Sequence, residues 1–233
     1  MSVLPDLVAE GDELDALDAA EPDWSRPTPA AGWTVAHQIA HRAAADANVL
    51  TAIRRPEAFD AEPKDADLEA AAGAAESRSV LLERWRAGRA APAAALGDVP
   101  LDHAFPWFGS QVTAVLMVPL RRRETWARGQ DVFDAFGAAH PPTGRLRHVA
   151  GRRLSFYAAQ APMPAEEFRV ELAGPDGELW TWGPEDAAQR VRGSALDFCL
   201  RGTHRGRRGR GPVAGHRPRV PVSVTPGRRR SPS

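Results

Sequence analysis

The stretch RETWARGQD, residues 123–131, contains the pair of side chains that most directly suggests chemistry in this sequence. Glu124 and Arg128 stand four residues apart, so both lie on one face of a helix. Two side chains at this spacing can hold a metal ion, but a guanidinium keeps its proton at any accessible pH and cannot be a ligand. The pair is therefore either a helix-surface ion pair, which contributes about 0.2–0.5 kcal/mol when exposed, or a metal site in which a cation has replaced one ligand.

The composition indicates a globular chain that works in a reducing environment. Its 233 residues suffice for one large domain or two small ones, and 43% of them are hydrophobic. No apolar run approaches the roughly 18 residues that a membrane-spanning helix needs, and the acidic N-terminus lacks the features of a signal peptide. The only cysteine, Cys199, excludes an internal disulfide and fits a cytoplasmic location.

The last part of the chain is strongly basic. Ten of the 30 basic residues and none of the 30 acidic residues fall in residues 201–233, which leaves the first 200 residues with a net charge of −10. Three interpretations remain open: a basic arm that binds nucleic acid non-specifically, an inert tail, or a frameshift product. The segment lacks aromatic residues that would stack on bases, so nucleic acid is not an expected partner. Residues 204–233 are predicted to be disordered because apolar periodicity is almost absent there.

Periodic apolar residues predict a mainly α-helical fold that begins with a bundle in residues 1–140. The predicted helices cover about residues 3–20, 34–54, 68–90 and 110–136. Thr34 is a suitable N-cap for the second helix, and Gly137 is a suitable end for the fourth. Pro119 lies inside the fourth helix and predicts a kink or a broken turn.

The character of the sequence changes after residue 140, where a small α+β domain is predicted for residues 141–203. A helix is expected over about residues 145–160. The alternating apolar residues of 168–172 and 179–182 flank a Gly-Pro-Asp-Gly turn, which predicts a β-hairpin. The residues that follow the hairpin, up to about 200, favour a further helix.

Four motifs together resemble a known family. They are GWTVAHQIAH, PWFG, RETWARGQD and ELWTWGPEDAAQRVRGSALDFCL. They are similar to the actinobacterial branch of the DinB-like, mycothiol-dependent maleylpyruvate isomerase family over most of residues 3–203. The resemblance implies a metal-binding four-helix bundle followed by a small α+β domain, which is incomplete here. It also implies a divalent metal, usually zinc, and a low-molecular-weight thiol such as mycothiol. This subgroup is generally described only as metal-binding.

The resemblance places the family's metal ligands on His41 and Glu124, with a third ligand at residue 128. That residue is Arg128, whose charge predicts that the metal is held weakly or lost. His37 is a substitute third ligand, because it shares a face with His41, or else it is the N3 partner of Thr34 at the start of the helix. For His41 the competing interpretation is a packed core histidine. Arg128 itself is a candidate anion clamp for a carboxylate substrate.

Two functions follow from these residues. The first is a metal-binding protein with thiol-dependent isomerase or transferase activity, which acts on a low-molecular-weight thiol or a small carboxylate. The second is a non-catalytic scaffold whose basic tail binds nucleic acid. The two are distinguished by whether the His41–Glu124 pair holds a metal ion.

Overall fold

The protein divides into two compact units, Met1–His140 and Pro141–Ser233. The structure, a computed structural model, describes residues 3–61, 64–151, 154, 167–201 and 223–226. None of the described helices combines the length and the apolar character that crossing a membrane requires.

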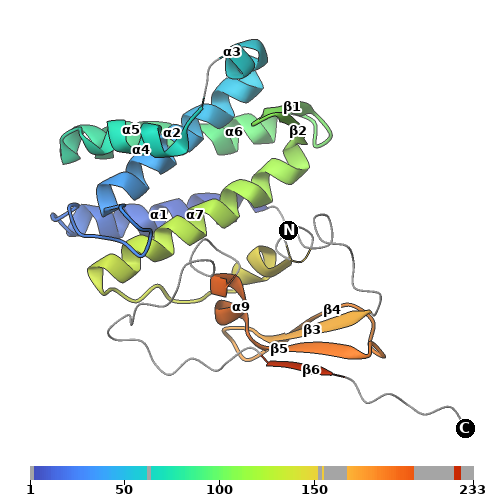
Figure 1. The fold of residues 1–233 in the computed structure, drawn as a ribbon. Coiled ribbons are helices and arrows are strands. Elements are labelled where there is room, and N and C mark those ends of the chain that lie inside the picture. The colour runs from blue at the N-terminus through green and yellow to red at the C-terminus, as the bar shows by residue number, and fades with distance from the viewer. Residues whose placement is uncertain (1–2, 62–63, 152–153, 155–166, 202–222, 227–233) are drawn as a thin grey trace, which may run out of the picture. The chain divides into compact units, whose positions relative to one another are not determined.

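The first unit is a helical bundle with one small hairpin (Figure 1). Its elements are α1 (Val3–Ala20), α2 (Val35–Arg54), α3 (Pro56–Ala61), α4 (Ala66–Ala74), α5 (Arg78–Gly88), α6 (Ala91–Asp98), β1 (Ala104–Trp107), β2 (Ser110–Thr113) and α7 (Ala114–Phe136). Figure 1 shows α1 and α7 side by side, and α2 packs against α4, α5 and α7. The functional residues expected on α2 and α7 are therefore carried by neighbouring helices.

Two apolar clusters hold this bundle together. One joins α1, α2, α5 and α7 around the fully buried Trp85, and the other joins α2, α3, α6, β1 and α7 around Phe105 and Met117. Burial of a side chain of this size contributes about 1.5–3 kcal/mol, so the clusters fix the relative positions of α2 and α7.

The predicted third helix is two helices. The expectation of one helix over residues 68–90 was wrong because α4 ends at Ala74 and Ser77 begins a new helix, α5. Its hydroxyl accepts a hydrogen bond from the backbone N–H of Val80 at 3.4 Å, which is the role of an N-cap. The uniform composition of this segment concealed the break.

The predicted fourth helix begins later than expected. Ser110 does not cap it, because residues 110–113 form β2, which pairs with β1. The turn between the strands has positive φ angles at both central residues, 45° at Phe108 and 78° at Gly109, as a two-residue hairpin requires. Thr113 then occupies the N-cap position of α7.

Helix α7 runs unbroken through Pro119, so the broken turn, one of the two outcomes that the sequence predicted, does not occur. The carbonyl that loses its N–H partner is that of Val115, which is 50% exposed, so water can satisfy it. The helix ends as predicted at Gly137, whose φ of 68° is left-handed.

The second unit contains a mixed sheet with the strand order β4-β3-β5-β6. Its elements are β3 (Phe168–Ala173), β4 (Leu179–Trp182), β5 (Gln189–Ser194), α9 (Ala195–Arg201) and β6 (Ser223–Pro226), preceded by helical residues 146–151 and 154. The predicted hairpin is present as β3 and β4, with Leu172 opposite the buried Trp180. The thiol of Cys199 in α9 is buried, with the residue 1% exposed. The rest of the helix predicted over residues 145–160 lies outside the described residues.

The segment after the hairpin is a strand before it is a helix. Residues 189–194 form β5, parallel to β3, where the sequence predicted a helix. Arg190 and Arg192 alternate along β5 and both bind Glu171 of β3, with Arg192 Nε 2.6 Å from its carboxylate. This period-two charge pattern is typical of a strand. Within the segment predicted to be disordered, Ser223–Pro226 pair with β5 as β6, and the remainder lies outside the described residues.

Asp18 of α1 makes one prediction about stability. Its side chain is fully buried, and neither carboxylate oxygen has a hydrogen-bond partner among the described residues. Burial, reinforced by Asp15, raises the pKa of Asp18 well above its usual value. The folded state therefore keeps a proton that the unfolded chain loses, so stability falls as the pH rises above about 4, towards the folded pKa.

Replacing this carboxyl with an amide removes that dependence. We expect Asp18→Asn to increase the free energy of unfolding at pH 7 by at least about 1 kcal/mol and to leave it nearly unchanged at pH 4. Urea unfolding of both proteins across this pH range measures the difference. A difference that does not grow with pH would contradict the assignment.

Candidate functional site

Helices α2 and α7 bring together the two residues that the family resemblance selected. His41 Nε2 lies 3.4 Å from Glu124 Oε1, and the two side chains are 12% and 27% exposed. The contact joins two neighbouring helices of the bundle and is partly open to solvent. It is the part of the candidate site that the sequence located.

Arg128 also binds the carboxylate of Glu124. Its Nε donates a hydrogen bond of 2.8 Å to Glu124 Oε1, the oxygen that faces His41. Its guanidinium carbon lies 4.7 Å from the ring centre of Trp33, whose ring is also 5.3 Å from that of His41. Within the described parts of the chain, no hydrogen bond engages the two terminal nitrogens of Arg128. The guanidinium of Arg128 is thus held by Glu124 through Nε and stacked on the ring of Trp33. Its two terminal nitrogens remain available to bind a ligand.

His37 takes part in the start of α2. The backbone N–H of Thr34 donates to Nδ1 of His37 at 3.3 Å, and the Thr34 hydroxyl lies 2.9 Å from the same nitrogen. This is the reciprocal arrangement of a capping box with a histidine in place of the acid. The nitrogen is engaged by the backbone, so the geometry favours the capping role of the two that the sequence left open.

The charges around Glu124 fix its ionisation. Burial acts to raise the pKa of Glu124, but the hydrogen bond with His41 and the charge of Arg128 together outweigh burial and hold it well below the usual range. The carboxylate therefore stays ionised between the imidazole of His41 and the guanidinium of Arg128. Its function in this arrangement is to position them.

This donor set does not fit a zinc ion held by three protein ligands. His41 and Glu124 supply two donors, and the described residues place no third histidine, cysteine, aspartate or glutamate with them. The third side chain is that of Arg128, whose guanidinium donates a hydrogen bond to Glu124 Oε1. A metal ion bound between His41 and Glu124 would need this same oxygen as a ligand. The arrangement suits an anion better than a dication.

A buried ion pair lies further along the same two helices. Arg121 of α7 donates a hydrogen bond of 2.9 Å to Asp46 of α2, and both side chains are less than a tenth exposed. Arg42 is also buried, and its Nε and Nη1 have no hydrogen-bond partner among the described residues. Burial lowers the pKa of Arg42 to about 10, although the carboxylate of Asp46 favours its charge.

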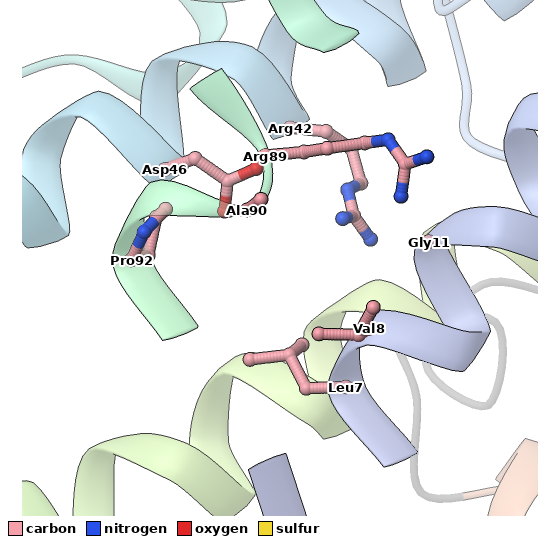
Figure 2. Close-up of a pocket in the computed structure, with 8 residues that line it drawn as sticks. All are labelled: Leu7, Val8, Gly11, Arg42, Asp46, Arg89, Ala90 and Pro92. Atoms are coloured by element: carbon pink, nitrogen blue, oxygen red, sulfur yellow. The ribbon is translucent and has the colours of Figure 1, made fainter. Parts of the chain in front are cut away.

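Arg42 also borders a small pocket (Figure 2). Figure 2 shows Arg42 extending from α2 towards the α1 residues of the lining, which consists of Leu7, Val8, Gly11, Arg42, Asp46, Arg89, Ala90 and Pro92. Its volume of about 10 Å³ is roughly the space that one water molecule needs. The pocket is too small for an organic substrate, so the candidate binding site is the group around Trp33 and Arg128.

Sequence reasoning missed several of these residues. Trp33 is one of them, and its place beside His41 and beneath Arg128 follows from the fold of the segment before α2. The buried partners Asp46 and Arg121 carried no signal of their own, because arginines and acids are frequent throughout this chain.

The architecture places the protein in a structural class. A helical bundle in which His41 and Glu124 face each other, followed by a small α+β unit, has the fold of mycothiol-dependent maleylpyruvate isomerase. A crystal structure of that enzyme superposes with a TM-score of 0.64 at 19% identity, covering 94% of this chain and 95% of the enzyme. A histidine-to-alanine mutant of the enzyme gives a TM-score of 0.60 at 18% identity, covering 94% and 96% of the two chains.

The sequence comparison shows the family directly. Residues 7–133 match the model described as mycothiol maleylpyruvate isomerase N-terminal domain, and the chain belongs to this family. Residues 164–208 match a second model, described as wyosine base formation. Two uncharacterized Mycobacterium tuberculosis proteins, from strains CDC 1551 / Oshkosh and ATCC 25618 / H37Rv, are each 45% identical over 216 residues, covering 86% of this chain and 84% of their own. The family resemblance noted in the four motifs is therefore confirmed.

Proposed function

We propose that the protein is a thiol-dependent isomerase or transferase of this family whose site binds an anion, a small carboxylate or a thiolate, without a firmly held metal. The observation that carries the proposal is the hydrogen bond of 2.8 Å from Arg128 to Glu124, at the position where the family resemblance expects the third metal ligand. A zinc ion, the family's expected metal, would find two ligands and a competing cation there.

The charges of the cluster support anion binding. Glu124 holds Arg128 and His41 close together, and Trp33 supports the guanidinium from one face. The guanidinium of Arg128 is a permanent positive charge in this group. The free fork of Arg128 matches the geometry of a carboxylate, which it can bind through two parallel hydrogen bonds.

The same charges can activate a thiol. A thiol beside cationic groups has a lowered pKa, so a larger fraction is the nucleophilic thiolate near neutral pH. Addition of a thiolate to a conjugated double bond, followed by its expulsion after rotation, isomerises the bond and returns the thiol. In this proposal Arg128 supplies the positive charge that a metal ion would otherwise provide. Mycothiol is the thiol named in the structural relatives, and it is the proposed co-substrate here.

The experiment is a calorimetric titration of mycothiol, and separately of maleate, into chelator-treated protein. We expect one binding site in the wild type and at least a tenfold loss of affinity in Arg128→Gln, because the charged fork is lost. Arg84→Gln is the matched control, since Arg84 forms a 2.9 Å ion pair with Glu76 on the surface and should leave binding unchanged. Binding that needs added zinc, or that Arg128→Gln leaves intact, rejects the proposal.

A further inference from the structure

A second group of potential ligands lies where α1 meets the end of the bundle unit. Glu10 and Glu13 are three residues apart on α1 and share a face, and His140 follows α7. One ligand atom from each residue lies within 4.8 Å of the others. In the described residues this is the only such group of three or more histidine, cysteine, aspartate or glutamate side chains. It shares no residue with the cluster around Arg128.

The imidazole of His140 is oriented by its neighbours. Gln130 Nε2 donates to the carboxylate of Asp134 at 3.1 Å, so the amide oxygen of Gln130 is the atom that lies 3.1 Å from His140 Nδ1. Because that oxygen can only accept, Nδ1 carries a proton and Nε2 of the neutral ring has its lone pair free. The ring also stacks on Phe133, with centres 4.3 Å apart and planes 6° apart. Such a partner on the opposite nitrogen is typical of metal-binding histidines.

The distances fit a shared ion better than a direct contact. His140 Nε2 lies 3.7 Å from an oxygen of Glu10 and 3.7 Å from an oxygen of Glu13. A hydrogen bond between an imidazolium and a carboxylate is about 2.7–2.9 Å long. Ligand atoms bound to one zinc ion at about 2.0–2.2 Å are separated by roughly 3.3–3.8 Å.

The burial of the group adds a second reason. The side chains of Glu10 and His140 are each 4% exposed, whereas that of Glu13 is 38% exposed. Two carboxylates held together with one of them buried repel each other, and a dication neutralises both. The exposed side at Glu13 leaves a path of entry and room for a water molecule as a fourth ligand.

We propose that Glu10, Glu13 and His140 bind one divalent transition-metal ion, with zinc as the best match to a set of two carboxylates and one imidazole. Three protein ligands and one open position are common in zinc sites, and an imidazole ligand disfavours magnesium and calcium. The ion would connect α1 to the segment that follows α7 and so stabilise the bundle unit. This site is independent of the proposed anion site at Arg128.

The test is a zinc titration of the full chain after chelator treatment, read by a chromophoric zinc indicator and by the thermal unfolding midpoint. We expect one equivalent of zinc to bind and to raise the midpoint. His140→Ala and Glu13→Gln should each weaken binding at least tenfold and remove the thermal shift. Glu13→Gln changes a partly exposed residue, so it keeps the test valid if His140→Ala fails to fold.

Two controls assign the zinc to this site. Asp12→Asn changes an exposed acid on the same helix, bound to Arg89 at 2.6 Å, and should leave zinc binding unchanged. His41→Ala should also leave it unchanged. The inference is overturned if no stoichiometric zinc binds, if Glu13→Gln binds it like the wild type, or if His41→Ala abolishes it.

Discussion

Arg128→His is expected to increase the affinity of the His41–Glu124 site for zinc by roughly 100-fold or more. The substitution adds a third ligand at i+4 from Glu124 and removes a positive charge next to the position of the ion. A gain of this size corresponds to about 2.7 kcal/mol of binding free energy. Competition of each protein against a chromophoric chelator measures it.

Two further variants separate the causes of that gain. Arg128→Gln removes the charge without adding a ligand, so its gain should be much smaller than that of Arg128→His. Adding His41→Ala to Arg128→His should abolish the gain, which distinguishes this site from the separate site proposed at His140. If Arg128→His binds zinc no better than Arg128→Gln, the geometry around Glu124 no longer accommodates a metal at all.

The second large effect is expected at the buried ion pair. Arg121→Met should lower the free energy of unfolding by about 3–5 kcal/mol, because it leaves the carboxylate of Asp46 buried without its 2.9 Å partner. Combining it with Asp46→Leu should restore most of the loss, since the uncompensated charge is then gone. Denaturant unfolding of the two variants and the wild type measures both effects.

A surface pair of the same length provides the comparison. Arg84 and Glu76 are also 2.9 Å apart, with side chains 48% and 31% exposed. Arg84→Met should change the free energy of unfolding by no more than about 1 kcal/mol, because water screens this pair. A cost for Arg121→Met as small as that for Arg84→Met would show that Asp46 finds another partner, for which the nearby Arg42 is the candidate.

The sequence predicted the helices whose ends carry a local signal. Thr34 and Gly137 mark the start of α2 and the end of α7, and both act through hydrogen bonds or φ angles within a few residues. The break at Ser77 and the hairpin before α7 were missed, because a serine in an Ala-rich segment and a Phe-Gly turn are weak signals alone. Strand β5 was missed because its pairing partner β3 lies outside any local window.

The residues of the candidate site that lie in a family motif could be predicted from the sequence. The motifs around His41 and Glu124 located the pair, and the departure at Arg128 was visible in the sequence. The contact of Arg128 with Trp33 could not be predicted from the sequence, because it depends on how the loop before α2 folds against α7. His140 shows no ligand spacing in the sequence for a similar reason, since its relation to Glu10 is set by the packing of α1 against α7.

If a guanidinium has taken the place of a metal ligand beside Glu124, the His41–Glu124 pair should not hold zinc. Crystals of the full chain grown with stoichiometric zinc, measured at the zinc absorption edge, test this at the level of single atoms. We expect no anomalous peak between His41 and Glu124, with Arg128 Nε within hydrogen-bond distance of the carboxylate. A peak bonded to both His41 Nε2 and Glu124, with Arg128 displaced, would contradict it.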